Sequence, residues 1–255
     1  MTQQGDGAYA SDPTREVIHE VIRDHQGRWP QRSFLRQIPQ SALDDLVAAG
    51  RLMSFRSGET LIEEGAEGTD AYFLLSSYVK VTARLPDGGQ ALLAVRAGGD
   101  VVGEIAAADA DRRIATVRAC GMAPVYALEL TREAFTRVLS AHPDTLLRLT
   151  QAVGRKLRTA TRRRIDFTGC SALVCMARVL VELADDYGHS TGRDVVVGVD
   201  LTQLELGTLI GFQISSAQRS LRELRRQGLV STRSRRPIIR DMDALRSLAE
   251  LNAGP

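Results

Sequence analysis

Arginine is concentrated near the carboxyl end of this chain. Residues 201–240 contain eight arginines against two acidic residues, Glu205 and Glu223, although the formal net charge of the whole chain is only +2. A guanidinium group offers several N–H donors that fit phosphate or carboxylate oxygens. A local surplus of this kind favours a polyanionic partner. The carboxy-terminal part is therefore predicted to carry a binding surface for a polyanion.

The segment Leu201–Val230 has the periodicity of two short helices joined by a tight turn. Apolar residues recur at helical spacing, Thr202 and Glu205 fit a capping box, and Gly211 interrupts the pattern. Two helices with a basic outer face are typical of a helix-turn-helix that binds DNA. The alternative is an ordinary helical hairpin with a solvated basic face. The basic run continues into residues 234–240, SRRPIIR, as a wing would, and this favours the DNA-binding interpretation.

Composition excludes several classes of protein. With 255 residues, of which 44% are hydrophobic and 25% charged, the chain can form two domains with buried cores. No apolar run approaches the roughly 20 residues that span a bilayer. The first residues lack the basic start and apolar core of a signal peptide. We therefore expect a cytoplasmic protein without a membrane partner.

No catalytic or metal-binding constellation is evident. The histidines stand apart at positions 19, 25, 142 and 189, and we find no Ser-His-Asp or Cys-His arrangement. Cys120, Cys170 and Cys175 form no CxxC pair, so we expect buried thiols rather than a disulfide framework or a zinc site. A metalloenzyme barrel would need histidines on its strands, and none lies between His25 and His142. We therefore expect no enzymatic activity and no bound metal.

The hydrophobic period changes along the first half of the chain. Residues 1–12 are polar and glycine-rich, and we expect them to be disordered. Helical spacing follows over Thr14–Gln26 and within Phe34–Leu52. From Arg51 to Arg132, short apolar runs alternate with glycine or proline about every ten residues, which is typical of a sandwich or small barrel. The turn Pro86-Asp87-Gly88-Gly89 predicts a hairpin that needs a positive φ angle.

A long helix is predicted from His142 to Phe167. A heptad pattern runs over about three repeats, through Leu146, Thr150, Val153, Leu157, Ala160, Arg164 and Phe167. At 1.5 Å per residue such a helix would be roughly 39 Å long, more than one small barrel covers. We therefore predict a homodimer through this helix; the alternative is a core helix of one chain. Six basic residues between 155 and 164 need solvent, acidic groups of a partner, or an anion.

A second domain is predicted after a hinge at Phe167–Gly169. It begins with an apolar helix and continues through a strand, the helix pair, a two-stranded wing and a closing helix. The expected ranges are Ser171–Tyr187, Val195–Val199, Leu201–Val230, Leu229–Ile239 and Asp241–Asn252.

Taken in order, the glycine-rich barrel, the long helix and the winged helix-turn-helix resemble the Crp/Fnr family of bacterial transcription regulators. The resemblance covers about Phe34–Leu251 and rests on four motifs: SGETLIEEGAEGTDAYFLLSSYVKV, GGDVVGE followed by RRIATVRA, MARVLVELA and LTQLELGTLIGF. It implies an α+β fold with an amino-terminal double-stranded β-helix (jelly-roll) barrel. The implied parts are an extension (residues 1–30), an effector domain (31–141), a dimerisation helix (142–168) and a winged helix-turn-helix domain (169–255). It also implies a palindromic DNA operator and RNA polymerase as partners.

The resemblance further implies a cyclic nucleotide (cAMP, cGMP or c-di-GMP) in the barrel. Arg113 would pair with its phosphate, because a buried phosphate needs a cation and N–H donors. Gly103 and Glu104 would lie beside the ribose, and the Glu104 carboxylate would accept its 2′-hydroxyl. Thr161, with Arg162 from the partner chain, would close over the base. The implied effector site comprises Gly103, Glu104, Ile105, Arg113, Ile114, Thr161 and Arg162.

This chain departs from the pattern of the cyclic-AMP binders. They carry Ser or Thr directly after the phosphate-binding arginine, where this chain has Ile114, and usually Thr where it has Ala160. The loop 105–111 also lacks their bulky apolar residue. Two lost hydroxyls cost on the order of 1 kcal/mol each, or ten- to a hundredfold in affinity. Arg113 thus either binds a nucleotide weakly or in another pose, or is structural and paired with Glu104 or Asp111.

The DNA-reading positions implied by the resemblance differ as well. Ile214, Ser215 and Arg219 stand where the family commonly has Arg, Glu and Arg, and they follow Gln213, a poorer cap than serine. Arg219 can contact guanine bidentately and Ile214 a thymine methyl, so we expect an operator half-site unlike the family's commonest one. Phosphate contacts are expected from Thr202, Gln203, Gln218, Arg222, Arg233, Arg235 and Arg236.

Two other branches of the family, and one other mode of action, can be weighed. The oxygen sensors hold an iron–sulfur cluster with cysteines near the amino terminus, but the first cysteine here is Cys120. Haem sensors use a His or Cys in or beside the barrel, which His25 and His142 only flank. We therefore expect neither an iron–sulfur cluster nor haem. The alternative to ligand control is an effector-independent regulator with a degenerate pocket.

Overall fold

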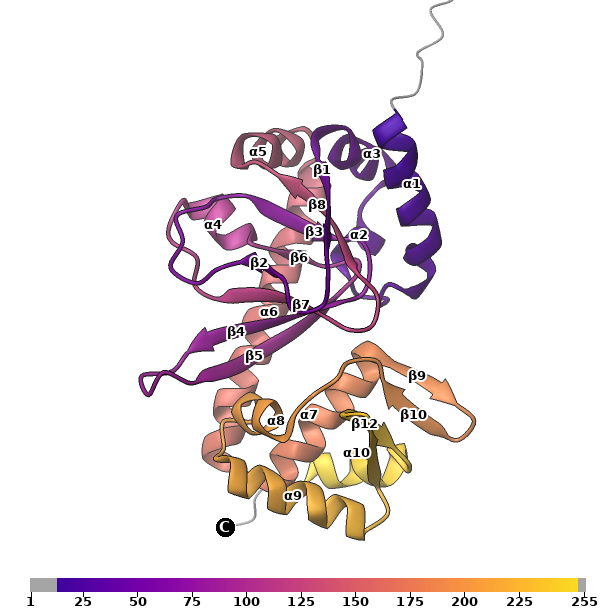
Figure 1. Cartoon of the computed structure of the whole chain (residues 1–255), viewed down its shortest axis with the longest axis vertical. Coiled ribbons are helices and arrows are strands. Elements are labelled where there is room, and N and C mark those ends of the chain that lie inside the picture. Colours follow the sequence, from indigo (N-terminus) through magenta and orange to yellow (C-terminus); the bar gives the residue numbers. More distant parts are fainter. Residues whose placement is uncertain (1–12, 252–255) are drawn as a thin grey trace, which may run out of the picture.

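Two antiparallel sheets form a barrel in the amino-terminal part of the computed structural model, in which residues 13–251 are described (Figure 1). The sheet orders are β1-β8-β3-β6 and β2-β7-β4-β5. The expected double-stranded β-helix (jelly-roll) barrel is confirmed, while the expectation of disorder for residues 1–12 lies outside the described residues. The strands are β1 Arg51–Phe55, β2 Thr60–Ile62, β3 Ala71–Leu74, β4 Tyr78–Arg84, β5 Gln90–Ala97, β6 Val101–Val102, β7 Thr116–Cys120 and β8 Val125–Leu130.

The barrel strands alternate with tight turns that glycine makes possible, as the spacing of the glycines predicts. Gly88, between β4 and β5, has a φ angle of 84°, a conformation that glycine adopts without a steric cost. The hairpin then pairs Arg84 with Gln90 at its closed end. Phe73, wholly buried, lies 5.7 Å from the ring of Phe34 and 6.1 Å from that of Phe135. These aromatic contacts join the barrel to the helices around it.

Short helices cover one end of the barrel. They are α1 Pro13–His25, the 3₁₀ turn η1 Gln26–Arg28, α2 Phe34–Gln37, α3 Gln40–Ala49 and α5 Arg132–Ala141, while α4 Glu104–Asp109 follows β6. Ile18 of α1 is 1% exposed, and the Trp29 indole nitrogen donates to the Leu75 carbonyl at 2.8 Å. The amino-terminal helix is thereby packed into the barrel's own core.

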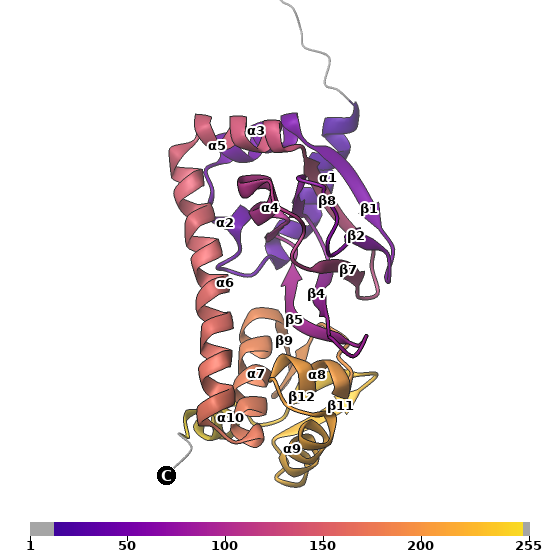
Figure 2. The same cartoon turned by 90° about the vertical axis from the view of Figure 1, so that its left-hand side faces the viewer.

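The long helix α6 (Pro143–Gly169) runs along one side of the barrel and continues below it (Figure 2). It buries Leu149 and Ala152, but Leu157 is 66% exposed. The interpretation as a core helix of one chain is therefore wrong. Helix α6 extends through Gly169, so it includes the segment Phe167–Gly169 that was predicted to hold the hinge.

The break between the domains falls at Cys170 and Ser171. Ser171 is the cap of α7 (Ala172–Tyr187), and its hydroxyl accepts from the Val174 amide. The ring of Phe167, which the heptad pattern placed on the dimer seam, lies 5.1 Å from that of Phe212 in the same chain. Phe167 therefore holds the end of α6 against the second domain.

The second domain combines the four helices α7 to α10 with a four-stranded sheet in the order β11-β12-β10-β9. Its core includes Met176, Leu180, Ala217 and Leu224, each fully buried. The elements after α7 are β9 Gly188–Thr191, β10 Asp194–Val197, α8 Gln203–Leu209, α9 Ile214–Arg226, β11 Val230–Arg233, β12 Arg236–Ile239 and α10 Met242–Glu250. The expected winged helix-turn-helix is confirmed, and the strand β9 was not expected.

Helix α8 docks the second domain onto the β4–β5 hairpin of the barrel. The Lys80 ammonium lies 2.6 Å from the Glu205 carboxylate, and the Leu92 amide donates to the Thr208 hydroxyl at 2.9 Å. Leu92 and Val95 belong to the same buried cluster as the core of the second domain. The barrel hairpin therefore fixes the orientation of α8 in this structure.

No helix within residues 13–251 is long and apolar enough to cross a membrane.

Candidate functional site

The helix pair α8 and α9 is positioned by local capping. The Thr202 hydroxyl accepts from the Glu205 amide at 3.1 Å, and the Glu205 carboxylate accepts from the Thr202 amide at 2.8 Å. This confirms the capping box predicted from the sequence. Gly211 makes the turn with a φ angle of 79°, and Gln213 precedes α9 without a side-chain cap.

Helix α9 presents one apolar and one polar face. Ala217, Leu221 and Leu224 are buried against α7 and α8. On the other side, the predicted reading residues Ser215 and Arg219 are exposed. Gln213, which precedes α9, is exposed, as are Ile214, Ser215, Arg219 and Arg222 of α9, while Gln218 is half-buried. The structure therefore leaves the polar face of α9 accessible to a groove of DNA.

Four of the eight arginines in residues 201–240 are engaged by the protein itself. Arg225 donates to the Thr232 hydroxyl at 2.9 Å, and Arg226 pairs with Glu223 at 2.6 Å. Arg236 pairs with Asp200 at 2.6 Å, and Arg240 pairs with Asp194. Arg236, from which a phosphate contact was predicted, thus holds the base of the wing in this structure.

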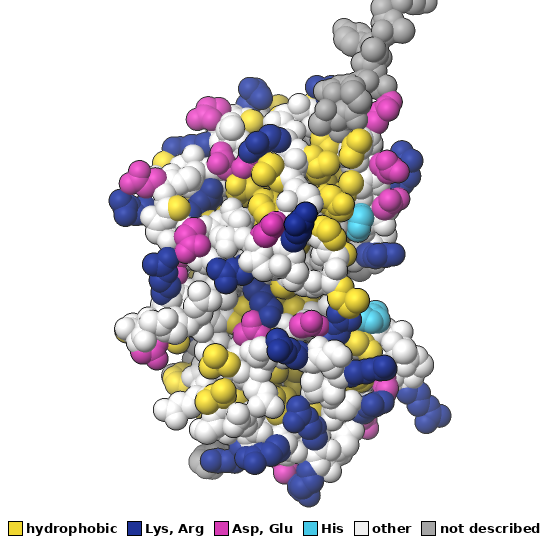
Figure 3. All heavy atoms as spheres, in the orientation of Figure 1, with side chains coloured by type: hydrophobic (Ala, Val, Ile, Leu, Met, Phe, Trp, Pro, Cys, Tyr) yellow, Lys and Arg dark blue, Asp and Glu magenta, His cyan; other side chains and the backbone are white. Residues whose placement is uncertain are grey.

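The other four arginines are Arg219 and Arg222 on α9 and Arg233 and Arg235 on the wing. Within residues 13–251 their side chains form no ion pair and no hydrogen bond. Figure 3 shows basic side chains spread over this lower end of the molecule. Positive φ angles at Ser234 and Arg235, 49° and 64°, turn the chain at the tip of the wing. We call these four residues the free arginine set.

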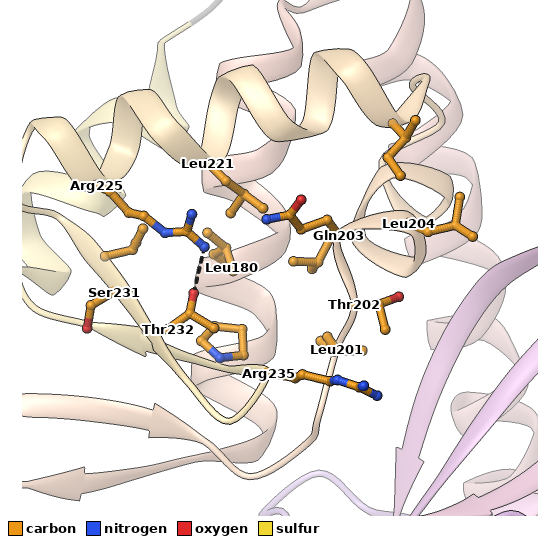
Figure 4. A pocket seen from close by; sticks show the side chains of 14 residues that line it. Leu180, Leu201, Thr202, Gln203, Leu204, Leu221, Arg225, Ser231, Thr232 and Arg235 are labelled. Atoms are coloured by element: carbon orange, nitrogen blue, oxygen red, sulfur yellow. Dashed lines mark hydrogen bonds between the residues drawn. The ribbon is translucent and has the colours of Figure 1, made fainter.

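A hollow of about 460 Å³ lies between α8, α9 and the wing (Figure 4). Its apolar wall includes Leu180, Leu201 and Leu221, and Arg225 crosses toward Thr232 at one end. No sequence pattern indicated this bond, because its two residues belong to separate elements. The hollow brings together four of the predicted DNA-binding residues: Thr202, Gln203, Ile214 and Arg235.

In the barrel, Arg113 is held by the main chain. Its guanidinium donates to the Gly103 carbonyl at 3.0 Å and to the Asp70 carbonyl at 2.6 Å, and its side chain is 6% exposed. Burial lowers the pKa of Arg113 below its usual value. The alternative of an ion pair with Glu104 or Asp111 is wrong, since neither carboxylate pairs with Arg113.

Glycine is required at position 103. Gly103 has a φ angle of 81° and precedes α4. A β-carbon there would lie 2.7 Å from an Arg113 guanidinium nitrogen and 2.8 Å from the Asp70 carbonyl oxygen. The close approach of Gly103 to Arg113 therefore depends on the absence of a side chain. Arg113, Gly103 and the start of α4 form what we call the cradle.

Glu104 forms an ion pair with a residue that no sequence motif singled out. Its carboxylate accepts from Lys156 of α6 at 2.8 Å, and the same ammonium donates to the Val101 carbonyl at 2.7 Å. Glu104 is 5% exposed. The only signal in the sequence was the basic run from 155 to 164, which did not distinguish Lys156 from its neighbours. Lys156 thus takes the acceptor expected to bind a ribose hydroxyl.

The remaining predicted effector residues lie toward the surface. Ile114 is 69% exposed and Ile105 is 39% exposed. Thr161 is exposed on α6, and Arg162 lies 3.3 Å from Asp166, one turn along the same helix. Within residues 13–251 no three His, Cys, Asp or Glu side chains are grouped so that they could hold a metal ion.

Two family models match separate parts of the chain. The model of the cyclic nucleotide-binding domain matches residues 52–142, and the model of the Crp-like helix-turn-helix domain matches residues 176–248. The first region contains the cradle, and the second contains the free arginine set.

Relatives and solved structures with the same organisation extend over most of this chain. The CRP-like cAMP-activated global transcriptional regulator of Mycobacterium tuberculosis is 26% identical over 82% of this chain and 92% of its own length. The corresponding CRP of Salmonella typhimurium is 24% identical over 72% and 87%. A CRP-family transcriptional regulator from Thermus thermophilus superposes with a TM-score of 0.65 at 25% identity, covering 79% of this chain and 98% of that one. The c-di-GMP-responsive regulator CLP of Xanthomonas campestris gives 0.68 at 18% identity, covering 80% and 100%, and shows the shared fold.

Proposed function

The chain belongs to the Crp/Fnr family of transcription regulators, and we propose that it acts as a homodimer on palindromic DNA under the control of a small anionic ligand in the barrel. It is a DNA-binding protein and not an enzyme. The free arginine set is the observation that carries the mode of DNA binding, because these four cations, unpaired within the described part of the chain, line one end of the molecule. RNA polymerase is the further partner that we propose.

The proposed dimer is supported by the outer face of α6. Leu146 is 47% exposed and Leu157 is 66% exposed, and both belong to the heptad pattern. Exposed leucines at this spacing along a 27-residue helix are typical of a helix that packs against a copy of itself. A two-fold dimer would present two copies of α9, which is why a palindromic operator is expected.

The proposed DNA contacts divide into two kinds. Arg219, with Ile214 and Ser215 beside it on α9, is positioned to read base edges. Arg222, Arg233 and Arg235 are expected to bind phosphate, together with the side chains at the start of α8 and α9: Thr202, Gln203, Gln213 and Gln218. The half-site is therefore proposed to be read through one arginine and one apolar contact.

The proposed ligand site is supported by a buried charge that no carboxylate of the described residues contacts directly. Arg113 is buried, and within residues 13–251 it forms no ion pair; both of its hydrogen-bond acceptors are neutral carbonyls. A buried cation without a counter-ion is costly, and a ligand phosphate would relieve that cost. The residues fit an anion, with Arg113 supplying charge and Gly103 permitting the close approach of main-chain N–H groups at the start of α4, beside Glu104 and Ile105.

A second candidate function is an effector-independent regulator, and the Lys156–Glu104 ion pair favours it. A cyclic nucleotide that used Glu104 for its ribose hydroxyl would have to displace Lys156, losing a contact of 2.8 Å to a carboxylate that is 5% exposed. Ile114 offers no hydroxyl in place of the family's Ser or Thr. Thr161 and Arg162 are proposed to complete the site only across the dimer, as the resemblance implies.

Calorimetry separates the two candidates. Titration of the full chain with cAMP, cGMP and c-di-GMP should release heat with at least one nucleotide, and Arg113→Gln should abolish that heat. A matched control is Arg112→Gln, because Arg112 is 68% exposed and pairs with Glu67 at the surface. No heat at millimolar nucleotide, together with tight operator binding, would establish the effector-independent regulator.

Sedimentation tests the dimer. Leu157→Asp should give monomers, because two carboxylates would meet at the centre of the proposed seam. Leu85→Asp is the control, since Leu85 is 37% exposed at the β4–β5 turn, away from α6. If Leu157→Asp sediments as the dimer, α6 does not form the interface.

A further inference from the structure

Two cysteines lie at the joint between α6 and α7. Cys170 is the cap residue that follows α6, and Cys175 is the fourth residue of α7, whose cap is Ser171. A side chain just before a helix cap and one at the fourth helical position face each other, as in a hydrophobic staple. Cys170 accordingly packs against the buried cluster that contains Cys175.

Both sulfur atoms also contact residues of one ion pair, Asp166 and Arg178. An Arg178 guanidinium nitrogen lies 3.2 Å from the Cys170 sulfur and donates to the Asp166 carboxylate as well. The Cys175 thiol donates to the Asp166 carbonyl at 3.4 Å. The two thiols therefore belong to one compact group that spans the end of α6 and the first turns of α7.

The two cysteines differ in their access to solvent. Cys170 is only partly buried, and an Arg178 guanidinium nitrogen lies 3.2 Å from its sulfur. Cys175 is 3% exposed, and burial raises the pKa of its thiol to about 11. Cys170 is therefore accessible to a small oxidant from solvent, while Cys175 is buried next to it. The sequence-based expectation of buried thiols is confirmed for Cys175, while Cys170 and Cys120 are partly buried.

We propose that Cys170 and Cys175 are a peroxide-reactive thiol pair that closes to an intrachain disulfide at the joint. The Cys170 thiolate attacks one oxygen of hydrogen peroxide, the O–O bond breaks, and the products are a sulfenic acid and water, which takes up the proton lost by Cys170. The Cys175 sulfur then attacks the Cys170 sulfur, and hydroxide leaves with the Cys175 proton as a second water. Two thiols are oxidised to one disulfide while one peroxide is reduced to two waters.

The disulfide would act on the attachment of the DNA-binding domain. Arg178 donates to the Ala249 and Leu251 carbonyls at the end of α10 in addition to Asp166 of α6. Figure 2 shows the lower end of α6 beside α10 and α7. Arg178 thus joins three helices, and drawing the Cys170 sulfur toward Cys175 removes one of its acceptors. This regulatory consequence rests on the proposed DNA-binding function, whereas the thiol chemistry does not.

Peptide mass measurement tests the chemistry. One tryptic peptide, residues 165–178, contains both cysteines, because it runs from the residue after Arg164 to Arg178. After brief treatment of the full chain with hydrogen peroxide and alkylation, this peptide should be lighter by two hydrogens and unalkylated, while Cys120 is alkylated. Cys175→Ser should stop at a Cys170 sulfenic acid that dimedone traps, and Cys120→Ser should close as the wild type does.

Three results would overturn the proposal: a fully alkylated peptide 165–178 after peroxide, oxidation of Cys120 first, or disulfides only between chains. For the regulatory consequence, the oxidised chain should bind its operator about fivefold or more differently from the reduced chain, with reversal by dithiothreitol and no effect in Cys170→Ser. Equal affinity of a chain shown by mass to carry the disulfide would overturn the switch. Failure of the reduced chain to bind DNA at all would count against the proposed function instead.

Discussion

The cradle in the barrel and the free arginine set on the DNA-binding domain both offer positive charge, but they hold it in opposite ways. Arg113 is 6% exposed and fixed by two main-chain carbonyls, at 3.0 and 2.6 Å. Arg219 and Arg235 are exposed, and their side chains have no partner within residues 13–251. The barrel therefore holds a single guanidinium in place without a ligand. The DNA-binding domain leaves several guanidinium groups free to adjust to a partner.

The difference follows from the ligand each region is proposed to bind. A small anion presents one charge at one place, so a fixed cation and a glycine that permits close approach suit it. DNA presents a charge about every 1.7 Å of helix axis and exchanges counter-ions with the protein. Solvated arginines on a helix and a wing can adjust to such a surface. The same residue type is thus expected to contribute to stability in the barrel and to affinity at the DNA.

The largest effect is expected where the arginine is buried. Arg113→Ala should lower the free energy of unfolding by about 2–4 kcal/mol, because the buried Gly103 and Asp70 carbonyls each lose a donor. Urea unfolding of the full chain measures this loss. Arg112→Ala is the control and should change stability by less than about 1 kcal/mol, since Arg112 is 68% exposed. Equal stability of the two variants would mean that the cradle is not fixed by Arg113.

The next effect is expected in DNA affinity without a loss of stability. Arg219→Ala should weaken binding to the true operator by roughly 1–3 kcal/mol and change binding to random DNA little, because a bidentate contact to guanine is specific. Arg226→Ala is the matched control on the same helix, since Arg226 pairs with Glu223 instead. Fluorescence anisotropy on both DNAs provides the measurement. An equal loss on operator and random DNA would show that Arg219 contacts only phosphate.

A smaller effect is expected from the wing. Arg235→Gln should weaken binding to all DNA sequences alike. It should also reduce the slope of log K against log salt concentration by about one. Arg236→Gln serves as the comparison, because Arg236 is held by Asp200 at 2.6 Å. Titrations at several salt concentrations give both slopes. If Arg236→Gln changes the slope more than Arg235→Gln, the division between free and engaged arginines is wrong.

Local features of both regions could be predicted from the sequence. The capping box of Thr202 and Glu205, the turn at Gly211 and the hairpin at Gly88 depend on residues within a few positions of one another. The order of barrel, long helix and winged helix-turn-helix followed from the periods and the motifs. The long-range partners could not be predicted in this way. Glu205 also binds Lys80, 125 positions away.

The partners of charged residues were the least predictable part of the candidate site. Arg113 was expected to meet either a ligand phosphate or the carboxylate of Glu104 or Asp111, yet within the chain it binds main-chain carbonyls, which carry no signature in the sequence. Lys156 was one of six equivalent basic residues until the fold placed it beside Glu104. Phe167 followed the heptad pattern but packs on Phe212, because α6 extends far enough to reach the turn between α8 and α9. Tertiary packing decides such contacts, and periodicity does not.

The smallest effect is expected where the barrel meets the DNA-binding domain, at Asp186 of α7. Burial, and then the nearby Glu182 and Asp100, raise the pKa of its carboxyl from 3.8 to about 6, while Arg96 of β5 opposes the shift. A raised pKa means that the folded chain binds the proton more tightly than the unfolded chain, so stability falls as the pH rises from about 4 through 6. Above pH 6 the full cost of the charged carboxylate is present.

Asp186→Asn should therefore be more stable than the wild type at pH 7 and equally stable at pH 4, where the acid is protonated in the folded chain. Because Asp186 is exposed at the surface, screening by solvent should keep the gain below about 1 kcal/mol. Asp185→Asn is the control, since Asp185 pairs with Arg246 at 2.5 Å and should gain nothing at pH 7. Urea unfolding at both pH values decides the matter. A gain of the same size at pH 4 and pH 7 would mean that the substitution acts through packing and not by removing the negative charge of Asp186.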